Sequence, residues 1–373
     1  MAKIGEARSG EQLRISKERI DFSLWPVCKP NKRFTVQHRI FTANPWPVIA
    51  DAIKQNCPQT LLRPAGAFCA QAEDFFEASL NGRVLHAKPL LLYYSMLNLA
   101  KAFILTSGQV PLGYRPGHGI SERATEGQIA GAKITAHPHN PSKPQLFSDF
   151  LRAVCDKQIK KKREYRLGDV LPQVLPGHRL WCSASGSKER FVGVDALTFL
   201  TDTVNRSIWI RLVVERGVLS RLAITHEELL VRTGLGSAWR IAKLPDQPDL
   251  LCLERKVPVT FGRRPSDVVM EVVDDLRHSL WLAVQMVPPF AQYYLYAAPP
   301  NSRANVLPQL LSMYLVMFFL GSITRYRPHH FERLLESPYG AHIEGMLNEV
   351  PTQFLYLLAS TFLKREVVKA AIV

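Results

Sequence analysis

An almost uncharged run of residues, from Val306 to Thr324, stops abruptly at a cluster of basic side chains. Its apolar residues fall on nearly every side of a helical cylinder, which is typical of the central helix of a bundle. Two arginines and two histidines follow directly, at Arg325, Arg327, His329 and His330. Because such groups are buried only when they are paired or used, the end of this helix is the first candidate site.

A membrane span is the alternative interpretation of the same run. The run falls short of the roughly 20 residues of a span and carries Pro308, Gln309 and Ser312, so we expect no membrane crossing. The N-terminus mixes charges of both signs and contains no apolar stretch of the signal-peptide kind. The six cysteines are scattered without a CxxC pair, so neither a zinc site nor a disulfide framework is indicated. These patterns predict a cytoplasmic protein with reduced thiols and without a metal or other cofactor.

Helical patterns at both ends of the chain enclose a strand-rich middle. The first half predicts helices over 45–55, 65–81 and 89–108, then a long Gly-, Pro- and His-rich loop over 110–144, then a helix over 146–166 with a basic end. The middle contains β-branched runs between turns, with one helix opened by the capping-box pair Thr225 and Glu228. After Pro300 the chain is helical again.

This order predicts the α+β class, with one helical bundle assembled from both termini and interrupted by an α+β insert. Three consecutive domains are less attractive, because neither helical set alone can surround an all-apolar helix. The expected parts are an N-terminal arm over 1–40, a first helical part over 41–175, the insert over 176–300 and a C-terminal helical part over 301–373.

A polar stripe runs along the helix that begins at Pro89. Tyr94, Asn98 and Lys101 lie at i, i+4 and i+7, on one side of a mostly apolar cylinder. A buried asparagine needs partners for both ends of its amide, so Asn98 is either a packing residue between helices or part of a pocket wall. His118 follows in a glycine-flanked loop, where it can close over a ligand.

Arg325 and His330 have the chemistry needed to cleave RNA without a metal. A neutral imidazole can take the proton of a 2′-hydroxyl while a guanidinium holds the phosphate and its developing charge. Arg327 is a second phosphate clamp in this interpretation, with His329 nearby. The alternative is that these cations cap the buried helix, whose C-terminal dipole favours positive charge.

Charge makes a polyanion the leading kind of partner. Lys plus Arg number 47 against 32 Asp plus Glu, a net charge of +15, which favours nucleic acid, RNA before DNA. A basic patch supports this expectation, with Tyr165 as a stacking surface; it comprises Lys160, Lys161, Lys162, Arg163 and Arg166. The alternative is a merely solvated face.

Three segments resemble the YaaC-like family of bacterial proteins. They read LLLYYSMLNLAKAFILTSG, then GHGIS, and late in the chain LSMYLVMFFLGSITRYRPHHFERLL. The resemblance extends from roughly residue 40 to the C-terminus. The first and last segments are also more loosely similar to HEPN domains, helical bundles that include metal-independent ribonucleases of toxin and antiviral systems. That similarity implies a catalytic arginine and histidine a few residues apart, as Arg325 and His330 are, completed by dimerisation; Tyr326 and Pro328 depart from the pattern.

Three functions are therefore open. The sharpest is a metal-independent endoribonuclease of a toxin or antiviral defence system, acting as a homodimer or with a partner protein. The second is a non-catalytic nucleic-acid-binding or assembly subunit. The third is a binding protein for a small anionic ligand such as a nucleotide, held between Tyr94, Asn98 and Arg325.

Overall fold

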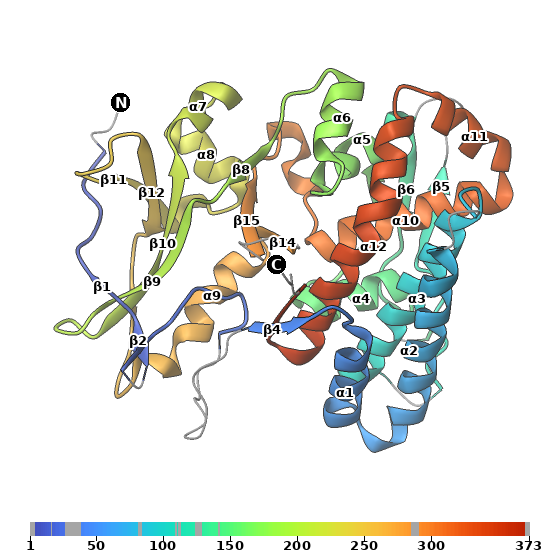
Figure 1. The fold of residues 1–373 in the computed structure, drawn as a ribbon, viewed down its shortest axis with the longest axis horizontal. Coiled ribbons are helices and arrows are strands. Elements are labelled where there is room, and N and C mark those ends of the chain that lie inside the picture. Colours follow the sequence, from blue (N-terminus) through green and yellow to red (C-terminus); the bar gives the residue numbers. More distant parts are fainter. Residues whose placement is uncertain are drawn as a thin grey trace. The chain divides into compact units, whose positions relative to one another are not determined.

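The computed structural model describes residues 4–15, 17–26, 39–80, 84–108, 110, 113–123, 129–140, 142–284 and 291–369. It has the predicted α+β class and forms two compact units (Figure 1). The strand-rich unit comprises Met1–Ala43, Lys188–Arg303 and Lys364–Val373, and the helical unit comprises Asn44–Ser187 and Ala304–Leu363. Cys28 and the predicted helix end at Asn81 and Gly82 lie outside the described residues.

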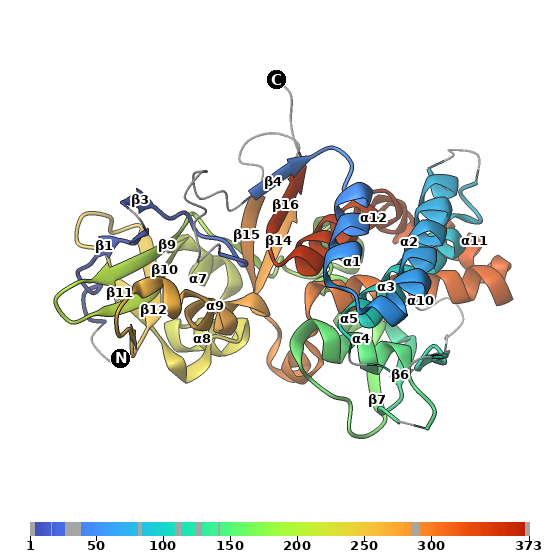
Figure 2. The ribbon, with the colours of Figure 1, turned by 90° about the horizontal axis from the view of Figure 1, so that it is seen from below.

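The helical unit is built from two distant parts of the chain. Its helices are α1 Trp46–Asn56, α2 Gln59–Ser79, α3 Lys88–Thr106, α4 Leu146–Cys155, α5 Leu167–Val170, α6 His178–Ser185, α10 Gln309–Tyr326, α11 Pro328–Glu336 and α12 Gly340–Leu363. Helices α2 and α10 both pack against α3, and the two views of the ribbon show the three lying together (Figures 1 and 2). The Trp46 amide donates to Asn44 Oδ1 at 3.0 Å, in a local turn just before α1, whose N-cap residue is Pro45.

Helix α10 is buried almost all round, as its apolar pattern predicts. It approaches α3 closely at Gly321, where an added Cβ would lie 2.9 Å from Tyr93 Cβ and 3.2 Å from the Pro89 carbonyl oxygen. Among the described helices, α3 is long and apolar enough to cross a membrane, but 78% of its most apolar window is buried inside the protein. Both helices therefore have the environment of core helices.

A small sheet replaces two features predicted from the sequence. The predicted loop over 110–144 contains β5 Ile120–Arg123 and β6 Lys133–Ala136, and the predicted helix over 146–166 ends at Cys155, so that β7 Arg163–Arg166 can pair with β6. The helix stops because Asp156 takes a left-handed conformation (φ 55°). These strands form because Ile134 and Tyr165 alternate with polar neighbours and bury one face of the sheet.

The described part of the strand-rich unit contains one larger sheet, one three-stranded sheet and two pairs of strands. Its strands are β1 Glu11–Gln12, β2 Arg14–Ile15, β3 Glu18–Arg19, β4 Arg39–Thr42, β8 Phe191–Gly193, β9 Ala196–Asp202, β10 Ser207–Glu215, β11 Trp239–Lys243, β12 Leu250–Arg255, β13 Val259–Thr260, β14 Leu280–Val284, β15 Ala291–Tyr296 and β16 Glu366–Lys369. The larger sheet has the order β1-β9-β10-β12-β11, with β13 also pairing with β10. Strands β14, β15 and β8 form a second sheet, β2 pairs with β3, and β16 runs parallel to β4.

Three helices complete this unit, α7 Gly217–Leu222, α8 His226–Thr233 and α9 Val269–Arg277. The capping box predicted at Thr225 and Glu228 is confirmed: the Thr225 hydroxyl accepts from the Glu228 amide, and the Glu228 carboxylate accepts from the Thr225 amide. Short 3₁₀ helices occur in both units. The helical unit contains η1 Ile129–Gly131 and η2 Leu171–Gln173, the strand-rich unit contains η3 Gly236–Ala238 and η4 Pro265–Asp267, and η5 Pro300–Asn305 lies where the chain passes from one unit to the other.

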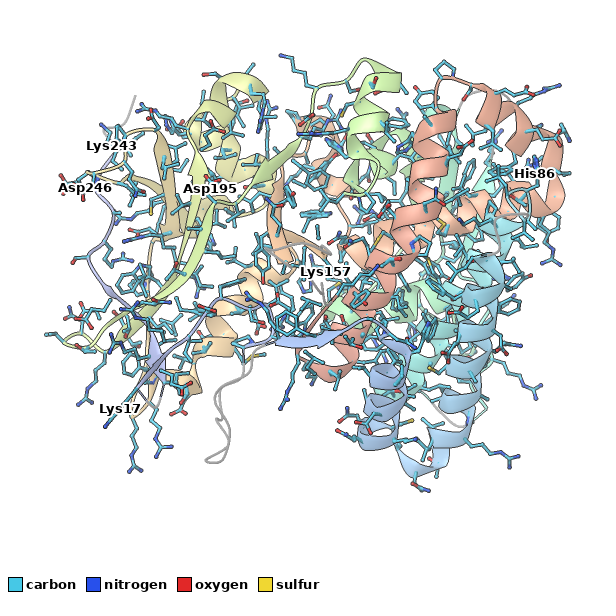
Figure 3. The ribbon with its side chains drawn as sticks, in the orientation of Figure 1. Lys17, His86, Lys157, Asp195, Lys243 and Asp246 are labelled. Atoms are coloured by element: carbon cyan, nitrogen blue, oxygen red, sulfur yellow. The ribbon has the colours of Figure 1, made fainter. Side chains whose placement is uncertain are left out.

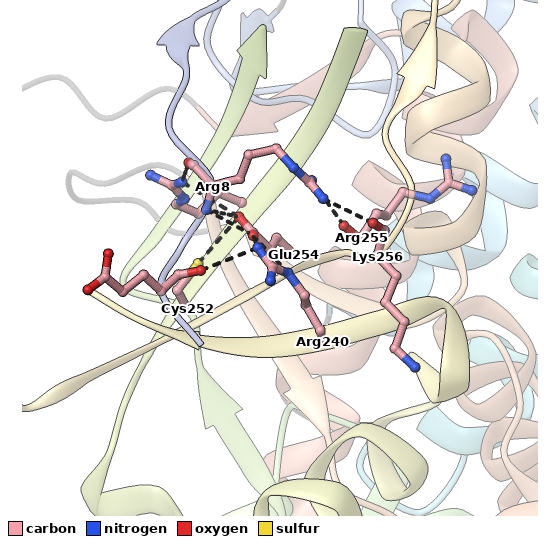
Figure 4. Close-up of polar contacts among 8 residues, drawn as sticks. Arg8, Arg240, Cys252, Glu254, Arg255 and Lys256 are labelled. Carbon is pink, nitrogen blue, oxygen red and sulfur yellow. Dashed lines mark hydrogen bonds and ion pairs between the residues drawn. The ribbon is translucent and has the colours of Figure 1, made fainter. Parts of the chain in front are cut away.

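The N-terminal segment is part of the strand-rich unit, where the sequence predicted a surface arm. Leu13, Ile20 and Phe22 are buried, and the Arg8 amide donates to the buried carboxylate of Glu254 at 3.0 Å (Figure 4). Glu254 also pairs with Arg240 and with Arg211. The segment is mostly polar, so its few apolar residues, which are spaced as in short strands, did not predict that it would pack into a sheet.

Charged side chains project from both units (Figure 3). Lys17, Lys243 and Asp246 are exposed on the strand-rich unit, and His86 and Lys157 are exposed on the helical unit.

Candidate functional site

The C-terminal end of α10 and the middle of α3 place Arg325 against Tyr94. Arg325 Nη1 donates to the Tyr94 hydroxyl at 2.8 Å, and the guanidinium lies 5.1 Å from the ring centroid of Tyr326. Tyr94 stacks on Phe75 of α2, with ring centroids 5.5 Å apart. Arg325 is exposed, and no carboxylate pairs with it among the described residues. The guanidinium is therefore oriented by one tyrosine while its other N–H donors remain available.

Lys101 lies two turns further along α3 than Tyr94. Its ammonium is 4.9 Å from the ring centroid of Phe68, a cation–π contact, and burial lowers its pKa. Within the described part of the chain, no acidic side chain forms an ion pair with Lys101. Its neighbour Asn98 is buried and donates to Gln71 Oε1 at 2.8 Å, so this amide ties α3 to α2.

His118 joins the same cluster from the loop before β5. Its Nδ1 lies 2.5 Å from the Tyr93 hydroxyl. Burial lowers the pKa of His118, and the charges of Lys101 and Arg325 lower it further. The imidazole is consequently neutral at pH 7, because both burial and the two nearby positive charges disfavour its protonated form. Burial also raises the pKa of Tyr93, so its hydroxyl stays protonated.

The loop around His118 is held in place by hydrogen bonds, whereas the sequence suggested a loop that can close over a ligand. The amides of Leu146 and Phe147 donate to the carbonyls of Gly117 and His118, at 2.9 and 3.3 Å. Gly119 has a φ of +76°, and an added Cβ would lie 3.0 Å from the Phe147 nitrogen. Only glycine fits this turn without strain, and the start of α4 fixes the loop.

Arg327 has a partner that the sequence did not reveal. It forms an ion pair with Glu122 of β5, and the Ser322 hydroxyl donates to the same carboxylate oxygen at 3.3 Å. The predicted second phosphate clamp is thus engaged with a carboxylate. Pro328 begins α11 directly after α10.

His329 and His330 lie in the first turn of α11. Their rings meet edge to face, with centroids 4.5 Å apart. His329 is exposed and His330 is partly exposed. No polar contact joins the His330 side chain to Arg325 within the described residues, whereas His118 lies close enough to Arg325 to feel its charge.

The basic patch does not lie on a helix, although the sequence predicted one over 146–166. Its three lysines, Lys160, Lys161 and Lys162, are exposed between α4 and β7, and Arg163 and Arg166 are exposed on β7. Tyr165 is buried, at 1% exposure, so it cannot offer a ring to a base as the sequence suggested.

We call Arg325, Lys101 and His118, with the rings of Tyr94 and Tyr326, the cationic cluster. Its two cations lack acidic partners within the described residues, and the rings of Tyr94 and Tyr326 lie beside Arg325. Such a combination suits a phosphate with an attached base. Sequence reasoning named Tyr94, Lys101, His118 and Arg325, but it missed Tyr93 and Glu122, whose partners are distant in the chain. Among the described residues, no group of three His, Cys, Asp or Glu side chains is placed to hold a metal ion.

The strand-rich unit has a cavity of about 450 Å³ of its own. Asp21, Asp195 and Arg39 are among its lining residues, and burial together with Glu215 raises the pKa of Asp195. None of the site residues predicted from the sequence lines it.

Comparison with known proteins identifies the chain at the level of a family. No curated protein and no solved structure matches it, so the HEPN-like bundle stays a prediction. The model of one family, described as YaaC-like Protein, matches residues 35–362, which is most of the chain. The chain therefore belongs to the YaaC-like family.

Proposed function

We propose that this protein binds single-stranded RNA at the cationic cluster. The observation that carries the proposal is an arginine and a lysine without acidic partners among the described residues, both acting on one neutral imidazole, with the rings of Tyr94 and Tyr326 beside the arginine. Guanidinium and ammonium groups bind phosphate, and aromatic rings stack on unpaired bases. The net charge of +15 adds a long-range attraction for the polyanion.

Arg325 is the residue to test first. Replacing it by glutamine in Arg325→Gln removes one charged donor and keeps a polar side chain. A hydrogen bond to a charged group contributes about 1.5–3 kcal/mol, so the Kd for an RNA of about 12 nucleotides should rise about tenfold or more. Fluorescence anisotropy of a labelled RNA measures this change.

Arg63→Gln is the matched control, because Arg63 is an exposed arginine on α2 in the same unit. It removes the same charge and should change the Kd by less than about twofold. Equal losses in the two variants would contradict a site at Arg325 and leave only a diffuse charge effect.

Cleavage of the bound RNA is the second candidate, and the neutral state of His118 favours it. In the tautomer whose Nδ1–H donates to Tyr93, Nε2 has a free lone pair that can take the 2′-hydroxyl proton. The 2′-oxygen then attacks the adjacent phosphorus, and the bond to the 5′-oxygen breaks. The products are a 2′,3′-cyclic phosphate and a 5′-hydroxyl end, which receives a proton. Arg325 stabilises the charge that develops on the phosphate oxygens.

The test compares His118→Gln and His330→Gln on RNA in EDTA, reading fragment ends for cyclic phosphate. Loss of cleavage in His118→Gln alone supports the base inferred from the cationic cluster. Loss in His330→Gln alone supports the base expected from the resemblance to HEPN ribonucleases. RNA that is bound but left intact by the wild type supports the non-catalytic binding subunit.

A further inference from the structure

The sheet formed by β5, β6 and β7 carries a row of three cations in register. Arg123 of β5 is paired with Lys133 of β6, and Lys133 is paired with Arg166 of β7. All three residues have the same strand orientation, because Ile134 and Tyr165, one position away, are buried on the opposite face. Arg123 and Arg166 are exposed, and Lys133 is partly exposed. We call these three residues the cation row.

Like charges placed directly opposite one another destabilise a sheet. One acidic residue lies among them: Glu164 of β7, whose carboxylate is 2.9 Å from Lys133 Nζ. The hydrogen bond and charge of Lys133 lower the pKa of Glu164, and Arg123 and Arg166 add to this shift. Three positive charges against one negative leave an excess that an external anion can neutralise.

The next row on the same face contains two hydroxyl groups beside the carboxylate of Glu164. Ser121 of β5 faces Thr135 of β6, which faces Glu164 of β7. Hydroxyl groups beside cations are common ligands of phosphate and sugar oxygens in nucleic-acid complexes. The face therefore offers both charge and hydrogen bonds to a sugar-phosphate backbone.

Strand β5 connects this face to the cationic cluster. It starts two residues after His118 and ends at Arg123, and it is an edge strand of the sheet. Glu122, which is paired with Ile134, points to the opposite face, where it binds Arg327, two residues from Arg325, so a strand of RNA passes around the β5 edge to reach both sites. The chain turns at Gly119 before it enters β5, so the five residues from His118 to Arg123 cover at most roughly 16 Å. A stacked strand of nucleic acid advances about 3.4 Å per nucleotide, so about five nucleotides span this distance.

We propose that the cation row is a second contact surface for the same RNA strand, which it engages by its backbone about five nucleotides from the cationic cluster. The proposal rests on the proposed function and specifies the ligand as an oligonucleotide longer than the cluster alone needs. A backbone contact of this kind adds affinity without reading sequence.

The experiment measures the affinity of RNA of about three and about 12 nucleotides as a function of salt. The triple variant Arg123→Gln, Lys133→Gln, Arg166→Gln should raise the Kd of the longer RNA about tenfold or more. Its log–log salt slope should be shallower by about 2, from three contacts at about 0.7 each. The short RNA reaches only the cationic cluster, so its Kd should change less than about twofold. Circular dichroism confirms that the variant is folded.

Glu164→Gln is the opposite change on the same face. It removes the carboxylate that pairs with Lys133 of the cation row and should lower the Kd of the longer RNA about twofold or more. Arg63→Gln again controls for net charge. Weaker binding in the triple variant together with tighter binding in Glu164→Gln supports a phosphate contact at this position.

The outcomes separate the two proposals. If the triple variant binds the longer RNA like the wild type, the cation row is not a contact surface, while the cationic cluster stands. If the wild type binds neither RNA, the proposed function fails and this inference fails with it. If the wild type binds vesicles of anionic phospholipid through the row and binds no RNA, the row serves a membrane surface and the inference is overturned.

Discussion

Ionisable side chains in this protein differ in whether a partner neutralises them. The buried carboxylate of Glu254 is surrounded by Arg211, Arg240 and the Arg8 amide, and Glu366, also buried, pairs with Arg39. Arg325 and Lys101 have no such acidic partner among the described residues. Since the chain pairs its buried charges elsewhere, the partly buried and unpaired ammonium of Lys101 suggests an external ligand, and the exposed guanidinium of Arg325 is accessible to the same ligand.

Glu254 should be essential for the stability of the strand-rich unit. Glu254→Gln leaves the guanidinium groups of Arg211 and Arg240 without their counter-charge, and breaking a buried pair in this way costs about 3–5 kcal/mol. Urea unfolding followed by circular dichroism measures the loss. Asp246→Asn, an exposed change in the same unit, should cost less than about 0.5 kcal/mol. A loss of under about 1 kcal/mol for Glu254→Gln would show that the N-terminal segment is held by other contacts.

His342 predicts how stability depends on pH. It is fully buried, its Nδ1 lies 2.9 Å from the Gly177 carbonyl, and burial lowers its pKa to about 4. Between about pH 6.5 and 4 the unfolded chain binds the proton and the folded chain does not, so the free energy of unfolding falls as the pH falls. This contribution is at most about 3.4 kcal/mol, and it levels off below about pH 4.

The measurement is the pH profile of urea unfolding for wild type and His342→Gln. The difference between the two profiles should be flat above about pH 6.5 and should change between about pH 6.5 and 4. His86→Asn, at an exposed histidine, should leave the profile unchanged. Parallel profiles for wild type and His342→Gln would contradict a neutral buried imidazole.

At the scale of elements, the long apolar helices were predictable and the short strands were not. Helix α10 was predicted because its apolar pattern continues for five turns, and the α8 capping box is a local signal. Strands β5 to β7 have four residues each and are formed by pairing between distant segments, which no local pattern records. The cationic cluster shows the same limit: its residues stood out in the sequence, but the pairing of Arg327 with Glu122 depends on tertiary structure.

The close packing of α3 and α10 should be sensitive to a single methyl group. Gly321→Ala places a Cβ 2.9 Å from Tyr93 Cβ, so the helices must separate, at a cost of about 1–3 kcal/mol. The movement also disturbs the hydrogen bond between Tyr94 and Arg325 and should weaken RNA binding. Thermal unfolding and anisotropy measure the two effects.

Gly66→Ala is the matched change on α2, where an added Cβ meets nothing within 4 Å. Alanine is favoured over glycine in a helix by about 0.5–1 kcal/mol, so this variant should be more stable than the wild type and bind RNA normally. If both variants gain stability, the contact between α3 and α10 is looser than described.

At the scale of the whole molecule, the proposed RNA-binding residues all belong to one of the two units. The helical unit contains both the cationic cluster and the cation row. The strand-rich unit contains Glu254 with its arginine partners and a separate cavity. Arg325 and Arg123 come from opposite ends of the helical unit's sequence, one after residue 304 and one before residue 187. The proposed RNA surface therefore exists only when the two distant segments have folded together.

The most direct test of the proposed site is photo-crosslinking of the full chain to RNA containing 4-thiouridine, with the linked peptides identified by mass spectrometry. We expect crosslinks at Tyr94 or Tyr326, whose rings flank Arg325, and we expect Arg325→Gln to reduce them together with the affinity. Crosslinks confined to the strand-rich unit, or crosslinks at these tyrosines that persist unchanged in Arg325→Gln, would contradict RNA binding at the cationic cluster.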